Sequence, residues 1–328
     1  MRKMIVRADD VGFSNVANIG TFEAIDKGIV TSADVMLDCP GTIDALERLK
    51  NYPFLSVGWH THMWGTPVTD KEHVQSLIEH GGEFDGRFRM DLRDAKDVSY
   101  DEAILELTNQ LERCKKILGK YPDTGASPHG DGPWNKALKD IQDKYKIPYG
   151  FASRLGGDER TKDRILKGRE RNEEWAFLYN PNGMPKSDAK EEYKKLNITI
   201  LDGGLPYMDL LTDSLADIEL NYDPVLYYTE DRAGILKMNK DIIVEQSWHP
   251  GYLDYFVYKE GERMGRPRAR QFSLARVQDV HSLCDERLRK WIKDNEIELI
   301  NFRDALYKEN SYQEHLKEIG SDLYINKK

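Results

Sequence analysis

The sequence predicts an α/β fold around a parallel sheet, either open or closed into a barrel, and two observations support this. Short apolar segments rich in β-branched residues alternate with segments of helical periodicity through the first 155 residues, as in parallel strands joined by helices. The chain has 328 residues, which exceeds the usual single domain but is ordinary for an α/β barrel. With 39% hydrophobic residues it can bury a sizeable core.

In the first part of the chain each strand signal runs into a helix signal. The predicted strands are Met4–Ala8, Thr31–Leu37 and Leu55–Trp59. The predicted helices that follow the first two are Val16–Lys27 and Thr42–Asn51. A polar, Gly-rich stretch then extends to about Val98.

The middle and end of the chain continue the alternation. Helical periodicity is strong over Tyr100–Leu118, and a short strand-like segment ends at Pro128–His129. The later predicted helices are Trp134–Tyr145, Gln271–Lys293 and Phe302–Lys308. The later predicted strands are Tyr149–Ala152, Ile198–Leu201, Asp241–Gln246 and Glu298–Ile300.

Two segments break this pattern, so we expect one domain over residues 1–328 with insertions at about 155–195 and 253–270. The first is Gly-rich and densely charged, and the second is aromatic and basic. Loops of this length in a compact domain are usually functional or disordered. We expect both to fold over the site, with Arg263, Arg266, Arg268 and Arg270 facing an oxygen-rich or anionic group. The alternative is an interface in a homo-oligomer.

Composition narrows the classes of function. The formal net charge of −9 argues against nucleic acid and against anionic membrane surfaces as partners, because both are negatively charged. Cys39, Cys114 and Cys284 are widely spaced, which is typical of reduced thiols rather than metal ligands. The N-terminus lacks the apolar core of a signal peptide, and no apolar run approaches the ~20 residues that span a bilayer. We therefore expect a cytoplasmic protein.

Two adjacent aspartates, Asp9 and Asp10, follow the first predicted strand. Like charges at this distance raise each other's pKa, and a metal ion or a proton relieves the conflict. The carboxyl ends of strands in parallel sheets and barrels are also where ligands bind. The alternative interpretation is a turn that only caps the next helix.

Histidines follow three further apolar segments. They are His60 and His62 after the third strand, His129 after the strand-like segment, and His249 shortly after Gln246. A carboxylate with two imidazoles is a common ligand set for a catalytic divalent metal that keeps one position open for water. His60 and His62 lie on the same side of an extended segment, so both could bind a metal, or one could lie behind it.

These residues lie in stretches that resemble a known family. Ala8–Ser14 is similar to the opening motif, Asn-Ala-Asp-Asp-Phe-Gly, of the YdjC/ChbG-like carbohydrate deacetylases, which are related to the polysaccharide deacetylases. Further similar stretches are Gly28–Ser32, Val57–His60, His249–Tyr252 and Arg276–Asp279 with Leu283. The resemblance covers most of residues 1–155 and 242–305. Its most specific part is the Asp-Asp opening combined with the His-Pro-Gly-Tyr stretch.

The resemblance implies a distorted or incomplete (β/α) barrel, here with two long insertions, and one divalent metal ion, with zinc or magnesium as the leading choices. It implies that Asp10, His60 and His129 bind the metal, that Asp9 is the base and that His249 is the candidate acid. The implied enzyme is a metal-dependent hydrolase that removes an N-acetyl group from an amino sugar or an acetylated oligosaccharide. Its partner is then a small carbohydrate.

The chain departs from the family pattern at two positions. The family often has asparagine where this chain has His62, and a second histidine where this chain has Asp131. Both departures keep ligand-type groups, so we expect metal binding to persist and assign these two residues to the substrate. Arg154 could orient Asp9 or a substrate oxygen, or form a surface ion pair. Trp248 could stack on a sugar or pack in the core.

Two other classes of function stay open. A barrel with a divalent metal could serve a sugar isomerase or a phosphoesterase, although the sequence shows no Glu-rich two-metal set and no Gly-rich phosphate loop at a helix start. A non-catalytic carbohydrate-binding relative is the other class, but a pure binder has no use for both Asp9 and Asp10.

Overall fold

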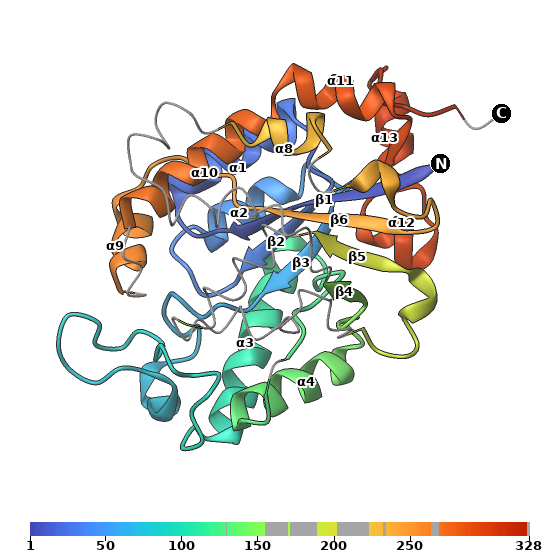
Figure 1. Ribbon diagram of the computed structural model, residues 1–328. Coiled ribbons are helices and arrows are strands. Elements are labelled where there is room, and N and C mark those ends of the chain that lie inside the picture. The colour runs from blue at the N-terminus through green and yellow to red at the C-terminus, as the bar shows by residue number, and fades with distance from the viewer. Residues whose placement is uncertain are drawn as a thin grey trace.

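The computed structural model describes residues 1–128, 130–154, 170, 189–201, 223–231, 234–263 and 269–326. Within this part of the chain, seven strands form one parallel sheet, which confirms the predicted α/β class (Figure 1). They are β1 (Arg2–Val11), β2 (Ser32–Met36), β3 (Ser56–His60), β4 (Ala152–Arg154), β5 (Ile198–Leu201), β6 (Ile243–Trp248) and β7 (Ile297–Leu299). Their order is β3-β2-β1-β6-β5-β4, and β7 pairs with the start of β1.

A short segment between α3 and α4 links the two edge strands of the sheet. The backbone N–H of Trp59 in β3 donates to the carbonyl of Thr124 over 2.9 Å. One residue further on, Gly125 donates to the carbonyl of Pro148 over 2.8 Å, and Pro148 leads into β4. These few bonds replace a regular strand ladder, so the sheet closes into a distorted barrel.

Helices surround the strands. In Figure 1, α1, α2 and α10 lie on one side of the sheet and α3 and α4 on the other, with both termini on the same side of the molecule. The longer helices are α1 (Asn15–Lys27), α2 (Thr42–Leu49), α3 (Tyr100–Leu118), α4 (Pro133–Tyr145), α9 (Tyr255–Arg263), α10 (Ala269–Leu283), α11 (Glu286–Asp294) and α13 (Ser311–Glu318). The shorter ones are α8 (Val225–Thr229) and α12 (Phe302–Tyr307), with 3-10 turns η1 (Lys71–His73), η2 (Gln75–Leu77), η4 (Lys194–Leu196) and η5 (Ile235–Lys237). No described helix is both long enough and apolar enough to cross a membrane.

The structure corrects two predicted segments near the C-terminus. The single helix expected over Gln271–Lys293 is two helices, because the side chain of Asp285 accepts a hydrogen bond from the N–H of Arg287 and starts α11 as its N-cap. The expected insertion at 253–270 is helical over Tyr255–Arg263. At the start of α11, local capping chemistry rather than the apolar periodicity sets the boundary.

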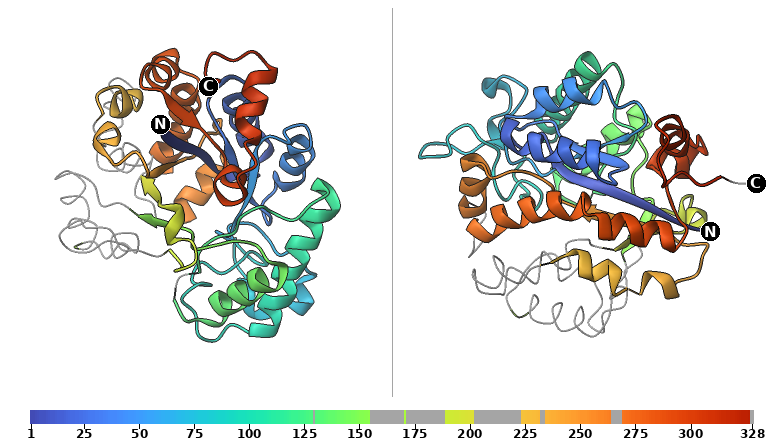
Figure 2. Two further views of the ribbon diagram at one scale, coloured as in Figure 1. Left: turned by 90° about the vertical axis from the view of Figure 1, so that its right-hand side faces the viewer. Right: turned by 90° about the horizontal axis from the view of Figure 1, so that it is seen from above.

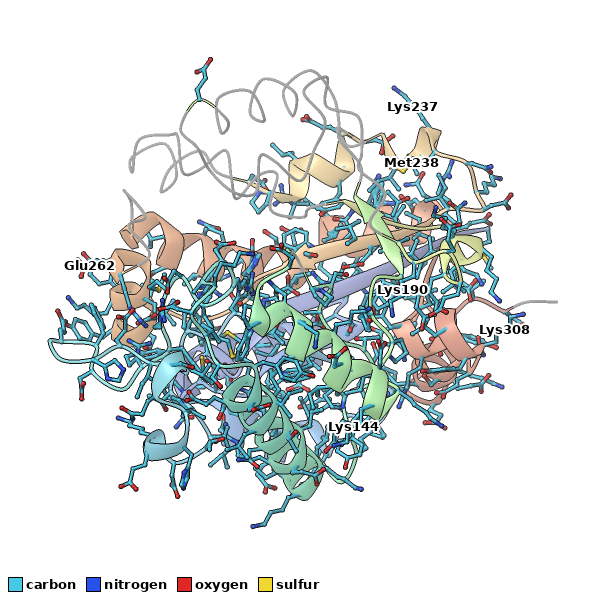
Figure 3. All side chains as sticks on the ribbon, turned by 90° about the horizontal axis from the view of Figure 1, so that it is seen from below. Lys144, Lys190, Lys237, Met238, Glu262 and Lys308 are labelled. Carbon is cyan, nitrogen blue, oxygen red and sulfur yellow. The ribbon has the colours of Figure 1, made fainter. Side chains whose placement is uncertain are left out.

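The core and the surface divide as the composition predicts. Three tryptophans, Trp59, Trp134 and Trp248, are among the largest fully buried side chains. Charged side chains such as Lys144 and Glu262, both labelled in Figure 3, are exposed. The interior of the barrel is an exception, because at its carboxyl end it also holds buried charged groups.

Candidate active site

Asp9 and Asp10 lie on an irregularity in β1. Ala8 pairs with Ala33 and Val11 with Val35, so β1 spends three residues where β2 spends two, which is a β-bulge. Asp10 within it has φ of 58°, in the left-handed region that aspartate tolerates better than most residues. Successive side chains of a regular strand point to opposite faces. The bulge re-aims them, and each aspartate interacts with the same histidine, as described below.

Arg7 holds Asp9. Its Nε lies 2.6 Å from Oδ1 of Asp9, and its Nη2 donates to Oδ2 over 3.0 Å. The same guanidinium lies 2.9 Å from Glu245 and 3.6 Å from Asp34, on β6 and β2. One buried cation is thus surrounded by three carboxylates from three neighbouring strands, which fixes the Asp9 side chain in place.

Gly58 makes room for one of these carboxylates. It pairs with Asp34 across β2 and β3, and a Cβ at position 58 would lie 2.1 Å from Oδ1 of Asp34. Any side chain there would push Asp34 away from Arg7. Glycine in this strand therefore serves the close approach of a charged side chain.

Asp10 lies between an imidazole and a second arginine. Its Oδ1 is 3.0 Å from Nε2 of His60, and its Oδ2 accepts a hydrogen bond from Arg276 of α10 over 2.5 Å. Oδ1 and Nε2 are both buried, yet neither makes a hydrogen bond of good geometry with any described residue. Two such atoms aimed at one point suit a divalent cation, and Arg276 orients the carboxylate from behind.

His62 and His249 complete the described part of the site. One ring nitrogen of His62 lies within 4.8 Å of ligand-type atoms of both Asp10 and His60. A second such group, Asp9, Asp34 and His60, shares the same histidine. Nε2 of His249 is 4.0 Å from Oδ2 of Asp9, and its backbone N–H donates to Asp279 over 2.9 Å.

Burial and neighbouring charges set the protonation of these groups. Burial raises the pKa of Asp9, but Arg7 and the nearby imidazoles outweigh it, so the pKa lies below its ordinary value. Against burial, Arg276 and His60 hold the pKa of Asp10 well below its usual range. Burial lowers the pKa of His249 and, together with the charge of His60, that of His62. Both aspartates are therefore carboxylates at neutral pH.

Four other residues were expected at the site: His129, Arg154, Asp131 and Trp248. His129 lies outside the described residues, and only the backbone of Arg154 is described. Asp131 is almost fully exposed and pairs with Lys96. Trp248, expected as a substrate contact, is 1% exposed and stacks on Tyr228, which assigns it to core packing.

The basic residues of the second insertion also need correction. Arg263 does not face solvent or a free anion: its side chain is 3% exposed, donates to the carbonyl of Phe88 and lies 3.7 Å from Glu260. It holds α9 against the 61–98 loop. The side chains of Arg266, Arg268 and Arg270 lie outside the described residues.

Sequence reasoning missed the arginines that hold the two aspartates. Arg7 stands two residues before Asp9, a spacing that places both on one face of a strand, and this was the available signal. The other arginine, Arg276, lies 266 positions from Asp10 in the chain, and no local pattern connects them. Glu245 sits inside an apolar strand segment, where a fully buried acid itself indicates a partner.

The family follows from a comparison with known proteins. A family model described as YdjC-like protein matches residues 3–294, so the chain belongs to the YdjC-like family. A carbohydrate deacetylase 2 of Listeria innocua is 23% identical over 307 residues, covering 92% of this chain and 98% of that protein. A carbohydrate deacetylase of Geobacillus stearothermophilus is 41% identical over 183 residues, 50% of this chain and 72% of that protein.

Two further matches concern a relative and a solved structure. A chitooligosaccharide deacetylase of Yersinia enterocolitica is 29% identical over 182 residues, 55% of this chain and 70% of that protein. The crystal structure of an Enterococcus faecalis protein, for which cleavage of cellobiose phosphate has been suggested, superposes with a TM-score of 0.58. It covers 92% of this chain and 98% of that one at 19% identity, which shows a shared fold.

Proposed function

We propose that this protein is a metal-dependent carbohydrate deacetylase that hydrolyses the N-acetyl group of an amino sugar or of an acetylated oligosaccharide. The observation that best supports the proposal is that the two adjacent carboxylates contact different groups. Asp10 faces His60, and Asp9 faces Arg7 and His249. One carboxylate is placed to hold a cation and the other to move a proton. The names of the relatives support the substrate class.

Asp10 and His60 would hold one divalent ion, zinc or magnesium, with His129 as the third ligand. Oδ1 of Asp10 and Nε2 of His60 lie 3.0 Å apart and make no well-formed hydrogen bond with any described residue, and these mixed oxygen and nitrogen donors support this set. When bound, such an ion lowers the pKa of a water towards ~7 and polarises a carbonyl oxygen. Arg276 holds the other oxygen of Asp10, which leaves only Oδ1 to point at the ion.

Asp9 takes the proton of the attacking water. The Arg7 contact keeps it ionised and immobile, so it stands ready as an acceptor. His249, 4.0 Å from Asp9, is placed to receive that proton and deliver it to the leaving amine nitrogen. Because burial lowers the pKa of His249, its protonated imidazole gives up a proton more readily than an exposed imidazolium does.

Acetate release from N-acetylated chitooligosaccharides tests the proposal. The wild-type protein should release acetate, lose this activity on exhaustive chelation and regain it when a divalent metal is restored. Asp294→Asn, at the exposed end of α11 and just before β7 at the opposite end of the sheet, is the control and should behave as wild type. Full activity after metal removal, with no metal detected in the protein, would contradict the mechanism.

A further inference from the structure

We propose that Glu260 is a positioning residue for substrate binding. Together with Arg87 and Arg263 it forms a buried clamp, called the α9 clamp below, that holds α9 on residues 61–98 and so sets the place of Trp64 beside the candidate metal site. The proposal rests on the proposed function, because it concerns how the acetylated carbohydrate binds at that site. Glu260 itself makes no contact with the reacting atoms.

The two segments joined by the α9 clamp leave the sheet from strands that are not neighbours. Residues 61–98 follow β3, which ends at His60, and α9 comes shortly after β6 and His249. In the sheet order β3-β2-β1-β6 two strands lie between them, and β1 carries Asp9 and Asp10. The clamp therefore connects the histidine on the metal side of the site to the segment that carries the candidate acid.

One face of α9 makes the contact. Phe256, Glu260 and Arg263 stand at helix positions i, i+4 and i+7, which places them on one side of α9. Glu260 is fully buried and pairs with Arg87, and its Oε2 lies 3.7 Å from Nη1 of Arg263. Arg263 also donates to the carbonyl of Phe88 over 2.5 Å. Loss of the carboxylate would leave two largely buried cations facing each other, so the contact is costly to break.

Arg87 links this contact to Trp64. Its Nη2 donates to the backbone carbonyl of Trp64, and its guanidinium lies over the ring of Phe256, 5.0 Å from the centroid. The next residue, Phe88, donates its N–H to the carbonyl of Gly65 over 3.2 Å. The backbone at Trp64 and Gly65 is therefore held by a segment that α9 fixes in place.

The ring of Trp64 lies against the candidate site. It stacks on the imidazole of His62, with centroids 4.3 Å apart and an angle of 11°. A ring nitrogen of His62 lies within 4.8 Å of ligand-type atoms of Asp10 and His60. Nη2 of Arg93 lies 3.2 Å from Nδ1 of His62. A shift of Trp64 would therefore move a side chain at the site itself.

Phe13 connects α9 to the same ring by a second route. It is fully buried, and its N–H donates to the carbonyl of Asp10 over 3.1 Å. Its ring meets Phe256 of α9 edge to face at 5.7 Å and packs on Trp64 at 5.1 Å. Side chains that are already ordered lose less conformational freedom when a ligand binds. We therefore assign the α9 clamp to the affinity for substrate rather than to the chemical step.

Loosening the clamp should weaken substrate binding and leave the chemical step intact. Glu260→Gln keeps the shape of the side chain but removes the charge that Arg87 and Arg263 share. The dissociation constant and KM for an N-acetylated chitooligosaccharide should rise about 10-fold, with kcat and metal content near the wild-type values. A variant that only lost stability would have fewer active molecules, which lowers the apparent kcat and leaves KM unchanged.

A milder change separates positioning from folding. Arg87→Lys keeps a positive charge for Glu260, but lysine lacks the fork with which arginine reaches both Glu260 and the Trp64 carbonyl. Its urea midpoint should stay near that of the wild type while KM rises. Glu262→Gln, which changes an exposed acid on the same helix that pairs with Lys259, is the matched control and should bind as the wild type does.

A double variant shows whether Glu260 and Arg87 act through one contact. Arg87→Met combined with Glu260→Gln should raise KM no more than the larger of the two single changes, because each single change already breaks the same ion pair. KM effects that multiply would show two independent roles and would contradict the clamp.

The outcomes separate this proposal from the proposed function. Wild-type KM and dissociation constants in Glu260→Gln and Arg87→Lys would overturn the positioning role. A wild-type protein that binds the oligosaccharide but releases no acetate would instead contradict the deacetylase function. In that case the dissociation constants of the variants still decide the role of Glu260.

Discussion

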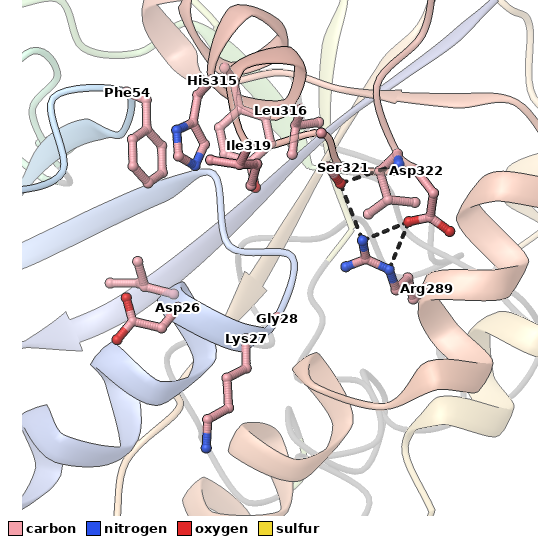
Figure 4. A pocket seen from close by; sticks show the side chains of 14 residues that line it. Asp26, Lys27, Gly28, Phe54, Arg289, His315, Leu316, Ile319, Ser321 and Asp322 are labelled. Carbon is pink, nitrogen blue, oxygen red and sulfur yellow. Dashed lines mark hydrogen bonds and ion pairs between the residues drawn. The ribbon is translucent and has the colours of Figure 1, made fainter.

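The charged groups at the two ends of the barrel differ in how deeply they are buried. At the carboxyl end, Asp10 and Arg276 pair with their side chains only 1% and 2% exposed. At the amino end, a cavity of about 390 Å³ lies beside α13 (Figure 4), and Arg289 pairs with Asp322 while 29% and 47% of those side chains remain exposed. Residues that precede β2 and β3, such as Gly28 and Phe54, line this cavity.

This difference in burial changes what the charged groups can do. A buried charge keeps its field, shifts the pKa of its neighbours and is costly to leave alone. An exposed pair is screened by water and contributes little. The amino-end cavity is instead held by packing, with the rings of Phe54 and His315 stacked nearly parallel at 4°. Active sites of barrel enzymes lie at the carboxyl end, and the charge distribution here agrees with that rule.

Removing the proton acceptor should have the largest effect. Asp9→Asn is nearly isosteric but cannot take a proton, so kcat should fall by about 10²–10⁴-fold while metal content stays at the wild-type level. Asp10→Asn should instead lower metal affinity. Acetate release and metal analysis on both variants distinguish these roles, and near-normal kcat in metal-loaded Asp9→Asn would remove Asp9 from the mechanism.

Removing the cation behind Asp10 should cost stability. Arg276→Met leaves a buried carboxylate unpaired, and the free energy of unfolding without metal should drop by about 3–5 kcal/mol. A divalent metal should restore part of this loss, because it supplies the missing positive charge. Urea unfolding with and without metal measures both effects. A loss of the same size with and without metal would show that Arg276 acts through packing alone.

Asp38 extends this comparison. Its carboxyl group is buried at the carboxyl end of the barrel and forms no ion pair with any described residue. Burial raises its pKa to about 6, against the hydrogen bond that it accepts from the N–H of Gly65 over 2.7 Å. The folded state therefore binds a proton that the unfolded chain, with a pKa near 4, has already released. The stability from this group is present below about pH 4 and is lost as the pH rises through 6.

Asp38→Asn should remove that dependence. The amide keeps an oxygen for Gly65 and stays neutral, so above pH 7 the variant should be more stable than wild type by roughly 2–3 kcal/mol. Below pH 4 the two proteins should be alike. Urea midpoints across this pH range measure the difference, and parallel curves would show that Asp38 is ionised throughout.

The smallest effect is expected at the amino end. Arg289→Met breaks the exposed pair with Asp322 and should change the free energy of unfolding by less than about 1 kcal/mol, with kcat unchanged. It is the matched control for Arg276→Met, since both remove one arginine of an ion pair. If the free energy of unfolding fell as much as it does for the buried pair, the proposed difference between the two ends would be wrong.

Some elements could be predicted from the sequence almost to the residue. The helix over Tyr100–Leu118 has the expected ends, because Ser99 caps its start and Gly119 ends it in the left-handed conformation. The strand expected at Tyr149–Ala152 instead begins at Ala152. There the pairing with β5, not local composition, decides where the strand lies.

The sequence by itself determined which side chains stand at the strand ends, since an apolar run followed by a polar residue specifies a strand and its terminus. Asp9, Asp10, His60 and His249 were found in that way. Only the tertiary structure decided which of them face one another. The bulge in β1, the approach of Arg276 from α10 and the bond from Arg93 to His62 depend on pairing between distant segments. Local residue patterns do not predict such pairings, because the contacts between distant segments form only when the chain folds.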